Sequence, residues 1–380
     1  MKRAAIISCN DNYDYDTRTK YVSEYLEKNG YKVDFVIADF DHRNKMPYIV
    51  ERNDNIIYIH VGEYDKNLSI RRIKSHIEFA RGVEKYLLKQ QYEVVYHCAP
   101  PNYTIKVLSK LKKKKKFKLI TEIGDMWPET MPVPVQIKQV LFIPLRFWSN
   151  LRDKYLDNSD VIVAECNLFN KQLRKKTGIQ HRIKTIYFCK KANYVEMDIK
   201  DFNMEDRIEL CYLGSINNII DCDIIGTFIN ELSNRKETIV HIIGDGEKKR
   251  NLIDSIESNG GKVQFYGKVF DEEKKKKIFS KCQYALNIMK TDVNVGMTMK
   301  SLDYFAFGIP IINNIGGDIE KMVETQKIGF NINAKNIKFV VDAIEKSNLN
   351  DYMNIRNNVK LVHEKYFSIE KFNQQMKEIL

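Results

Sequence analysis

Short apolar runs alternate with amphipathic stretches through the first half of the chain. The apolar runs fall at residues 4–9, 33–37, 56–60, 94–97, 118–122 and 160–164. Between them, apolar residues recur at helical spacing, most clearly in residues 70–88. Such alternation is typical of a parallel sheet with helices on both faces. We therefore expect an N-terminal α/β domain at residues 1–189.

The second half repeats this pattern after a break. Residues 190–206 are polar and of mixed charge, and we expect the interdomain hinge there. Further buried strands are predicted at residues 208–213, 241–243, 263–266 and 284–289. The predicted fold class is α/β, with two Rossmann-like, doubly wound parallel-sheet domains that face each other across a cleft. The second domain is expected at residues 207–366.

One stretch of the second domain, residues 295–320, predicts a helix between two loops. The helix should end at Gly308, and a buried strand should follow at residues 309–312. The first N–H groups of a helix have no partner within it, and the helix dipole adds positive potential there. We expect the start of this helix to hold phosphate groups through Gly296, Met297, Thr298, Met299 and Lys300.

Two charged residues support the expectation that a phosphorylated ligand binds here. A cation in the first turn of a helix, such as Lys300, is unfavourable unless an anion lies in front of it. Asp303, one turn further on, can accept the two hydroxyl groups of a ribose. The alternative is a well-capped core helix with a solvated lysine and aspartate.

Polar residues also follow the predicted strands of the first domain, where ligands of such sheets bind. His97 ends one strand, and a loop with Asp125, Trp127 and Glu129 follows the next. Carboxylates suit sugar hydroxyl groups, and an indole suits a sugar face. Asp16 and Arg18 lie at the end of the first loop. Asp16 is equally well explained as a helix cap, and His97 as a structural residue.

The chain is basic, with 62 Lys and Arg residues against 50 Asp and Glu residues and a net charge of +12. An unbroken lysine run begins at Lys112 and ends at Lys116, and an apolar and basic helical stretch, interrupted at Pro144, includes Leu141 and Arg152. Both are candidates for contact with an anionic membrane surface. The alternatives are a solvated loop and a core helix. Nucleic-acid binding is disfavoured because the lysine run lacks interleaved aromatic residues.

The cysteines and the absence of export signals point to the cytoplasm. The seven cysteines are scattered and mostly lie in apolar segments, which indicates free thiols. Neither a signal peptide nor a membrane-spanning stretch is predicted. No metal site is expected, because the two Asp-x-Asp pairs, at residues 14–16 and 221–223, fall in loops with other predicted roles.

Several motifs resemble those of GT-B glycosyltransferases, and of glycosyltransferase family 4 in particular. They are G-D-M-W-P-E at Gly124, Y-L-G-S-I at Tyr212, H-I-I-G-D-G-E at His241, V-Q-F-Y-G-K-V at Val263, M-K-S-L-D-Y-F-A-F-G-I-P-I-I at Met299 and I-G-G-D-I-E at Ile315. They occur in the family's order along nearly the whole chain. The resemblance also implies that residues 367–380 form a last helix that crosses back onto the first domain.

The resemblance implies roles for individual residues. Asp303 would hold the ribose, and Gly214, Ser215, Gly244, Gly267 and residues 296–300 would surround the nucleotide. The first acid of the family's E-x7-E element falls on Val295 here, and Asp292 or Asn294 would take its place. The catalytic candidates are Asp125, Glu129 and Lys300, and those for acceptor binding are Asp16, Arg18, His97 and Trp127.

We therefore predict a metal-independent glycosyltransferase without a cofactor. It would move a sugar from a nucleotide diphosphate to a hydroxyl group of a lipid-linked or polysaccharide acceptor, with retention, in the cytoplasm or on the inner face of the plasma membrane. The alternative is a catalytically silent GT-B protein that binds or stabilises a partner transferase. The missing acid at Val295 favours this alternative. A nucleotide-sugar epimerase would need more acid and base side chains around the donor.

Overall fold

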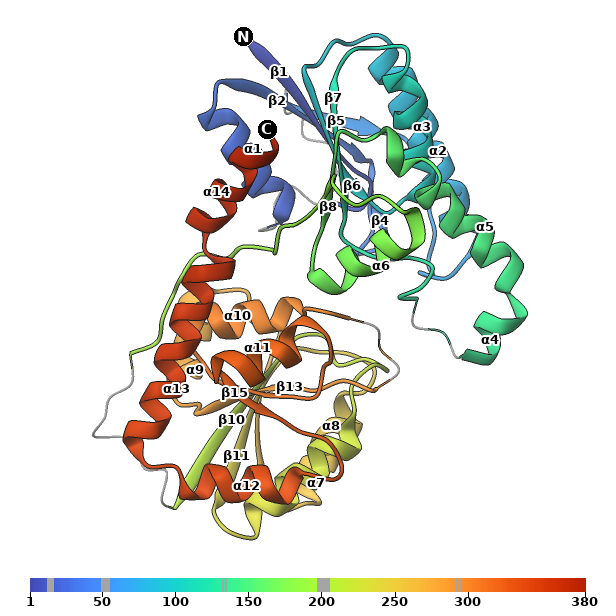
Figure 1. Cartoon of the computed structure of the whole chain (residues 1–380). Coiled ribbons are helices and arrows are strands. Elements are labelled where there is room, and N and C mark those ends of the chain that lie inside the picture. The colour runs from blue at the N-terminus through green and yellow to red at the C-terminus, as the bar shows by residue number, and fades with distance from the viewer. Residues whose placement is uncertain are drawn as a thin grey trace. The chain divides into compact units, whose positions relative to one another are not determined.

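The computed structural model describes residues 1–11, 17–48, 55–131, 133, 135–196, 206–291, 293 and 295–380. The chain divides into two compact units, which are Met1–Phe188 together with Asn373–Leu380, and Cys189–Phe372 (Figure 1). The hinge expected at residues 190–206 stays a prediction, because residues 197–205 lie outside the described residues.

The N-terminal unit is built on a seven-stranded sheet with the order β5-β2-β1-β6-β7-β8-β9. Its strands are β1 (Lys2–Ser8), β2 (Tyr31–Ala38), β5 (Ile56–Ile59), β6 (Val94–Ala99), β7 (Lys118–Ile123), β8 (Val161–Ala164) and β9 (Ile183–Thr185). Every neighbouring pair is parallel. This confirms the doubly wound α/β class. A short antiparallel pair, β3 (Phe40–Asp41) and β4 (Met46–Pro47), lies outside the sheet.

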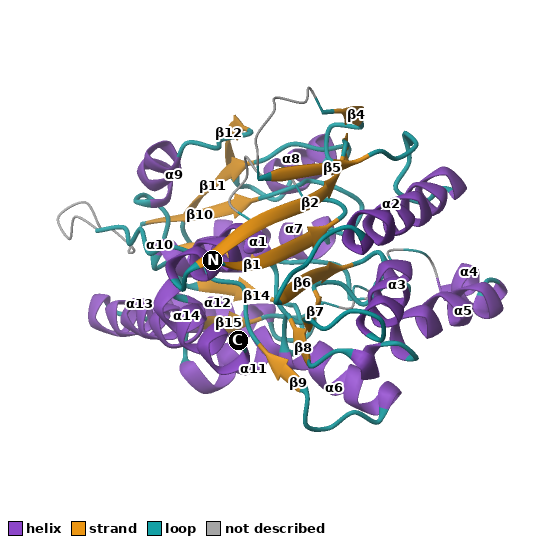
Figure 2. Ribbon diagram, turned by 90° about the horizontal axis from the view of Figure 1, so that it is seen from above, coloured by secondary structure: helices purple, strands orange, loops and turns teal. Residues whose placement is uncertain are grey.

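The helices of this unit are α1 (Arg18–Lys28), α2 (Ile70–Leu88), α3 (Asn102–Lys112), α4 (Val135–Val140), α5 (Phe142–Asp153) and α6 (Asn167–Thr177), with a 3-10 turn at Leu156–Asn158. In Figure 2, α2, α3 and α5 lie beside one another, and α3 contacts both of the others. The predicted break at Pro144 is wrong. The chain breaks at Leu141, and Pro144 lies in the first turn of α5, where its missing N–H costs nothing.

The C-terminal unit has a six-stranded sheet with the order β12-β11-β10-β13-β14-β15. Its strands are β10 (Arg207–Leu213), β11 (Glu237–Ile243), β12 (Lys262–Gly267), β13 (Tyr284–Asn287), β14 (Ile311–Asn313) and β15 (Gly329–Asn331), all paired in parallel. The strand order reverses at β10, and ligands of such sheets bind beyond the carboxyl ends of the strands at this point.

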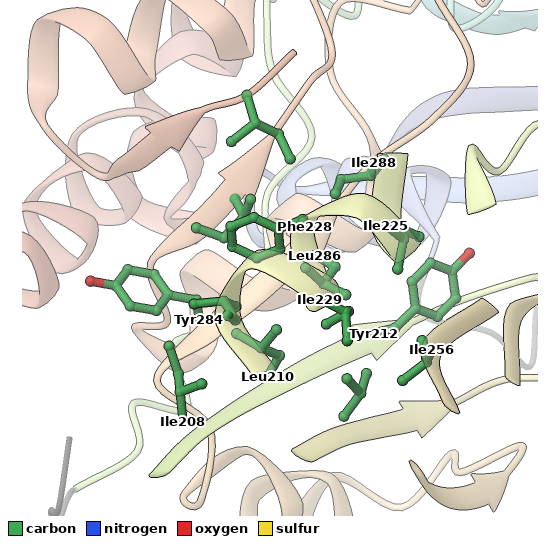
Figure 3. Packing of buried hydrophobic residues seen from close by; sticks show 14 of the residues in the cluster. Ile208, Leu210, Tyr212, Ile225, Phe228, Ile229, Ile256, Tyr284, Leu286 and Ile288 are labelled. Atoms are coloured by element: carbon green, nitrogen blue, oxygen red, sulfur yellow. The ribbon is translucent and has the colours of Figure 1, made fainter. Parts of the chain in front are cut away.

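The helices of the second unit are α7 (Cys222–Ser233), α8 (Lys249–Glu257), α9 (Glu272–Phe279), α10 (Met299–Phe307), α11 (Asp318–Gln326), α12 (Ile337–Lys346) and α13 (Leu349–Val362). The core forms where alternate side chains of the strands meet the apolar faces of the helices. Figure 3 shows Leu210 and Tyr212 of β10 close to Ile225 and Phe228 of α7, and all four are buried. The strands that lead to the carboxyl edge of the sheet are therefore held in place by a buried core.

A π-helical turn, His363–Phe367, joins α13 to the last helix, α14 (Ile369–Ile379). The end of α14 belongs to the N-terminal unit. Gln375 donates a hydrogen bond to the carbonyl of Thr185 (3.2 Å), and the Lys118 ammonium donates one to the carbonyl of Leu380 (3.0 Å). Among the helices that the structure describes, none has both the length and the apolar character needed to cross a membrane.

Candidate functional site

Helix α10 starts at the carboxyl edge of the C-terminal sheet and ends where the sequence predicts. Gly308 closes it in the left-handed conformation, with φ of 73°. The Tyr304 hydroxyl accepts a hydrogen bond from the N–H of Leu213 (2.8 Å) and donates one to the carbonyl of Leu286 (3.2 Å). Tyr304 thereby fixes the helix over the ends of β10 and β13, where the strand order reverses.

Lys300 lies in the first turn of α10 and is 8% exposed. Its ammonium group has no hydrogen-bond partner among the described residues and lies 4.8 Å from the centre of the Tyr212 ring. Burial lowers the pKa of Lys300 to about 7. A buried cation without a counter-ion is costly, so this arrangement favours an anionic ligand.

Three asparagines hold the start of α10 against the sheet. Asn287, Asn313 and Asn331 are register partners at the ends of β13, β14 and β15. The Asn287 amide donates to the Asn313 side chain (2.9 Å), and the Asn313 amide donates to the Asn331 side chain (2.8 Å). Thr298, the N-cap of α10, donates to Asn287 (2.8 Å). The sequence analysis missed this ladder, although each asparagine follows an apolar run.

The expected glycines lie beside one another at the same edge. The N–H of Gly244 donates to the carbonyl of Gly267 (2.8 Å), and the N–H of Gly214 donates to the carbonyl of Ile243 (2.9 Å). Gly244 has φ of 151°, and a Cβ atom there would lie 1.9 Å from the carbonyl oxygen of Gly214. Ser215 is exposed next to them. The structure thus brings these predicted residues together on neighbouring strands.

Other residues predicted for the nucleotide are already engaged or covered. The Asp303 carboxylate forms an ion pair with Lys190, and its ribose role stays a prediction. Gly296, Met297 and Thr298 are buried, whereas Met299 is half exposed. The N–H groups of Met299 and Lys300 have no acceptor in the described part of the chain. Asp292 and Asn294, the proposed substitutes for the missing acid at Val295, lie outside the described residues.

In the N-terminal unit, Asp125 follows β7, and its role as a catalytic residue stays a prediction. Burial raises the pKa of Asp125 to about 6, against hydrogen bonds from Thr130 and the backbone that lower it. A carboxyl group with this pKa changes its protonation state close to neutral pH.

Glu129 is held by ion pairs, and its catalytic role stays a prediction. Its carboxylate receives two hydrogen bonds from Arg152 (2.8 and 3.0 Å) and pairs with Lys176. Burial raises the pKa of Glu129, but these partners lower it more. Arg152 also donates to the carbonyl of Trp127 (3.0 Å), so the ion pair fixes the loop that carries Asp125. No direct contact with a reacting group follows from this geometry.

The remaining acceptor candidates are not all gathered at this loop. Trp127 is half-buried in the loop, with its ring 6.1 Å from that of Trp148. Arg18 is buried and forms an ion pair with Glu122. His97 is fully buried in β6, with neither ring nitrogen bonded to a described residue, and burial lowers its pKa to about 3. Asp16 lies outside the described residues.

Two residues near Asp125 escaped the sequence analysis. Glu165 directly follows β8, and burial, with Glu122 and Asp125 nearby, raises its pKa to about 8. Its place after an apolar run at the carboxyl edge was a usable signal. Arg72 lies in α2, with its guanidinium 4.6 Å from the centre of the Trp127 ring. Arg72 is the third residue of α2, so it is a cation in the first turn of a helix, which is the signal that identified Lys300.

The two predicted membrane segments lie at opposite ends of α3. Asn102, at the start of α3, donates to the carbonyl of Trp148 in α5 (3.3 Å), whereas the lysine run begins at its last residue. Lys112 pairs with Asp160, and Lys115 donates to the last carbonyls of α2. The lysine run thus has structural partners, whereas Val140, Phe142 and Phe147 of α4 and α5 are exposed.

No group of three His, Cys, Asp or Glu residues that could hold a metal ion occurs among the residues described. Metal independence stays a proposal, because residues such as Asp292 are not described.

The fold and the sequence both resemble known glycosyltransferases. The chain is 15% identical to sucrose-phosphate synthase from Thermosynechococcus elongatus, with a TM-score of 0.72 and coverage of 100% of this chain and 98% of that one. It is 12% identical to Anabaena Alr3699/HepE in complex with UDP and glucose (TM-score 0.68, coverage 100% and 99%). For the lipopolysaccharide outer core galactosyltransferase WaaB, the identity is 15% and the TM-score 0.66, with both chains covered completely.

A comparison with curated protein sequences gives no significant match. Two family models match consecutive parts of the chain. Glycosyltransferase Family 4 matches residues 16–188, and Glycosyl transferases group 1 matches residues 207–348. Together with the fold, these matches identify the chain as a member of the GT-B glycosyltransferases.

Proposed function

We propose that this glycosyltransferase moves a sugar from a nucleoside diphosphate donor to a hydroxyl group of a lipid-linked or polysaccharide acceptor, with retention and without a metal ion. The observation that carries the donor part is the buried Lys300 ammonium without a partner among the described residues. A diphosphate in front of α10 would supply its counter-ion. HepE in complex with UDP and glucose supports a UDP sugar as the first donor to test.

In the proposed reaction, the bond between the anomeric carbon and the β-phosphate oxygen breaks, and the nucleoside diphosphate leaves. Lys300 and the N–H groups at the start of α10 stabilise the negative charge that develops on the leaving group. A bond forms between the anomeric carbon and the acceptor oxygen on the same face that the leaving group departs from, which retains the configuration, and the acceptor proton passes to Asp125. Its pKa of about 6 suits this transfer near neutral pH.

The acceptor part of the proposal depends on the N-terminal unit. WaaB, a lipopolysaccharide outer core galactosyltransferase, supports a glycolipid or polysaccharide acceptor. The exposed apolar side chains of α4 and α5 support peripheral contact with the inner face of the plasma membrane. The lysine run is left out of this contact, because it lies at the other end of α3.

Lys300→Met tests the donor site separately from folding. UDP should raise the melting temperature of the wild type, by mass action. The Lys300→Met variant should lose most of this rise yet melt no lower without UDP, because methionine fills the space without a buried charge. Lys300→Arg is the matched control that keeps the charge. A full UDP response in Lys300→Met would refute the diphosphate site.

Hydrolysis of the donor without an acceptor distinguishes the proposed enzyme from a catalytically silent protein. The missing acid at Val295 is what favours the silent protein. An enzyme should slowly release UDP from a UDP sugar without an acceptor, and Asp125→Asn should not do so. UDP binding together with no hydrolysis and no transfer to any glycolipid acceptor would favour a silent partner protein.

A further inference from the structure

The N-terminal unit contains an apolar groove that the proposed chemistry does not use. It has a volume of about 740 Å³ and lies among α2, α3 and α5. Most of its lining is apolar, with Ile73, Ile77, Tyr103, Leu145, Trp148 and Leu151 as examples. This volume is in the range of ligand sites.

Polar groups without partners lie along this groove. Arg72 lines it and is 5% exposed, and its Nε has no acceptor among the described residues. Asn102 and His76 also line it, and Asn102 Oδ1 and His76 Nε2 are buried and likewise without partners there. Buried polar groups are normally bonded, so these atoms indicate a ligand with polar atoms.

The charged residues that line the groove indicate the sign of the ligand's charge. Its described lining includes two cations, Arg72 and Lys106, and no carboxylate. An anionic group would therefore be attracted to it.

The surroundings of the groove favour a ligand with a long apolar part. Several large apolar side chains that line it are exposed, among them Ile70 (85%) and Phe147 (66%). Contiguous exposed apolar surface marks contact with a partner or a lipid. The groove also borders the candidate acceptor site, because Asn102 donates to the carbonyl of Trp127 (2.9 Å) in the loop that carries Asp125.

We propose that this groove binds the hydrocarbon chain of a phosphorylated lipid acceptor, with the phosphate next to Arg72 and Lys106. This inference depends on the proposed function, because it identifies the acceptor as lipid-linked. The apolar chain replaces water along α2 and α5, and the phosphate supplies the acceptor that Arg72 Nε lacks. The sugar attached to the phosphate would then lie at the loop of Asp125.

Farnesyl diphosphate, below its micelle concentration, is a suitable probe. The chain has two tryptophans, and Trp148 lines the groove while Trp127 lies against Trp148. Tryptophan fluorescence therefore reports directly on occupancy. Farnesyl diphosphate should change this fluorescence saturably, and farnesol, which lacks the phosphates, should bind about tenfold more weakly.

Two substitutions test the groove, and one controls for the surface around it. Leu145→Asp and Ile73→Asp place a carboxylate in the lining and should weaken farnesyl diphosphate binding by about tenfold or more. Ile73 is 42% exposed, so its variant should fold even if Leu145→Asp does not. Ile143→Asp makes the same change on α5 at a residue that is 79% exposed and does not line the groove. Its binding should stay within about twofold of the wild type.

Each other outcome contradicts the groove assignment. Equal losses of farnesyl diphosphate binding in Ile143→Asp and Ile73→Asp would indicate that the probe adsorbs to the whole apolar face and not in the groove. Fluorescence changes with phosphatidylglycerol vesicles but not with farnesyl diphosphate would indicate that this face contacts a bilayer. Unchanged binding in Ile73→Asp would overturn the groove. Because these measurements contain no nucleotide, they fail or succeed independently of UDP binding, which tests the proposed donor site.

Discussion

The two units of this glycosyltransferase share a sheet architecture but differ in what lies at their carboxyl edges. In both, the strand order reverses at the first strand, β1 or β10. The C-terminal edge presents backbone glycines and one buried lysine without a described partner. The N-terminal edge presents titratable side chains, most of them paired, beside an apolar groove.

This difference indicates how the two substrates would be recognised. The diphosphate is the same in every nucleoside diphosphate sugar, so backbone groups and one cation can bind it. Acceptors differ in chain and sugar, so side chains and an apolar groove must select them. The comparison predicts that substitutions in the C-terminal unit change donor binding, whereas those in the N-terminal unit change transfer.

The largest effect is expected at Asp125. Asp125→Asn should lower kcat by about 10² to 10⁴-fold, because no group then accepts the acceptor proton. UDP should still raise the melting temperature of the variant. In the wild type, kcat/KM should fall as the pH drops below about 6, since protonated Asp125 is inactive. Glu63→Gln, at an exposed residue of the same unit, is the control. Transfer at the wild-type rate by Asp125→Asn would exclude Asp125 as the base.

Gly244→Ala should destabilise the carboxyl edge of the C-terminal sheet, because the added side chain would collide with the backbone. The new Cβ would overlap the carbonyl oxygen of Gly214, and the backbone at Gly244 is unfavourable for alanine. We expect a loss of about 3 kcal/mol in the free energy of unfolding, measured with urea. In Gly214→Ala the backbone is also strained, but the Cβ meets no atom within 4 Å, so its loss should be smaller. Equal losses in the two variants would show that overlap is unimportant.

The asparagine ladder should affect donor binding more than folding. Asn287→Ala removes the acceptor of the Thr298 hydroxyl and one step of the ladder. We expect a loss of about 1–3 kcal/mol in stability and a rise in the donor KM, with the acceptor KM unchanged. Asn287→Asp, which keeps the acceptor oxygen for Thr298, should recover part of the donor KM. If Asn287→Ala raises neither KM, the ladder has no positioning role.

The smallest effect is a pH dependence of UDP binding. Above pH 7 the free protein increasingly carries neutral Lys300, and UDP binding must then restore its proton. The affinity should therefore fall, by at most about tenfold per pH unit, between pH 7 and 9. Titration calorimetry in buffers of different ionisation heat measures this proton uptake. Lys300→Arg should flatten the profile, and an unchanged slope in that variant would assign the proton to another group.

Local patterns predicted much of the fold and part of the donor edge. Helix α2 has the predicted bounds, and α10 ends at Gly308 as expected, because periodicity and glycine caps are local properties. The glycines at Gly214, Gly244 and Gly267 could be predicted as neighbours, since each lies at the carboxyl end of a strand of one parallel sheet. The partners of Arg18 and Glu129 could not, because Glu122 and Arg152 are distant in sequence.

The sequence by itself determined most strands of the two sheets, helices such as α2 and α10, the two-sheet α/β architecture and the presence of a lysine at the start of α10. The tertiary structure alone decided that Lys300 is buried without a described counter-ion, that Glu129 is held by Arg152, and that α2, α3 and α5 enclose an apolar groove. The physical reason is that periodicity depends on neighbours along the chain. Burial, pKa and unpaired polar atoms depend instead on groups that only the folded chain brings together.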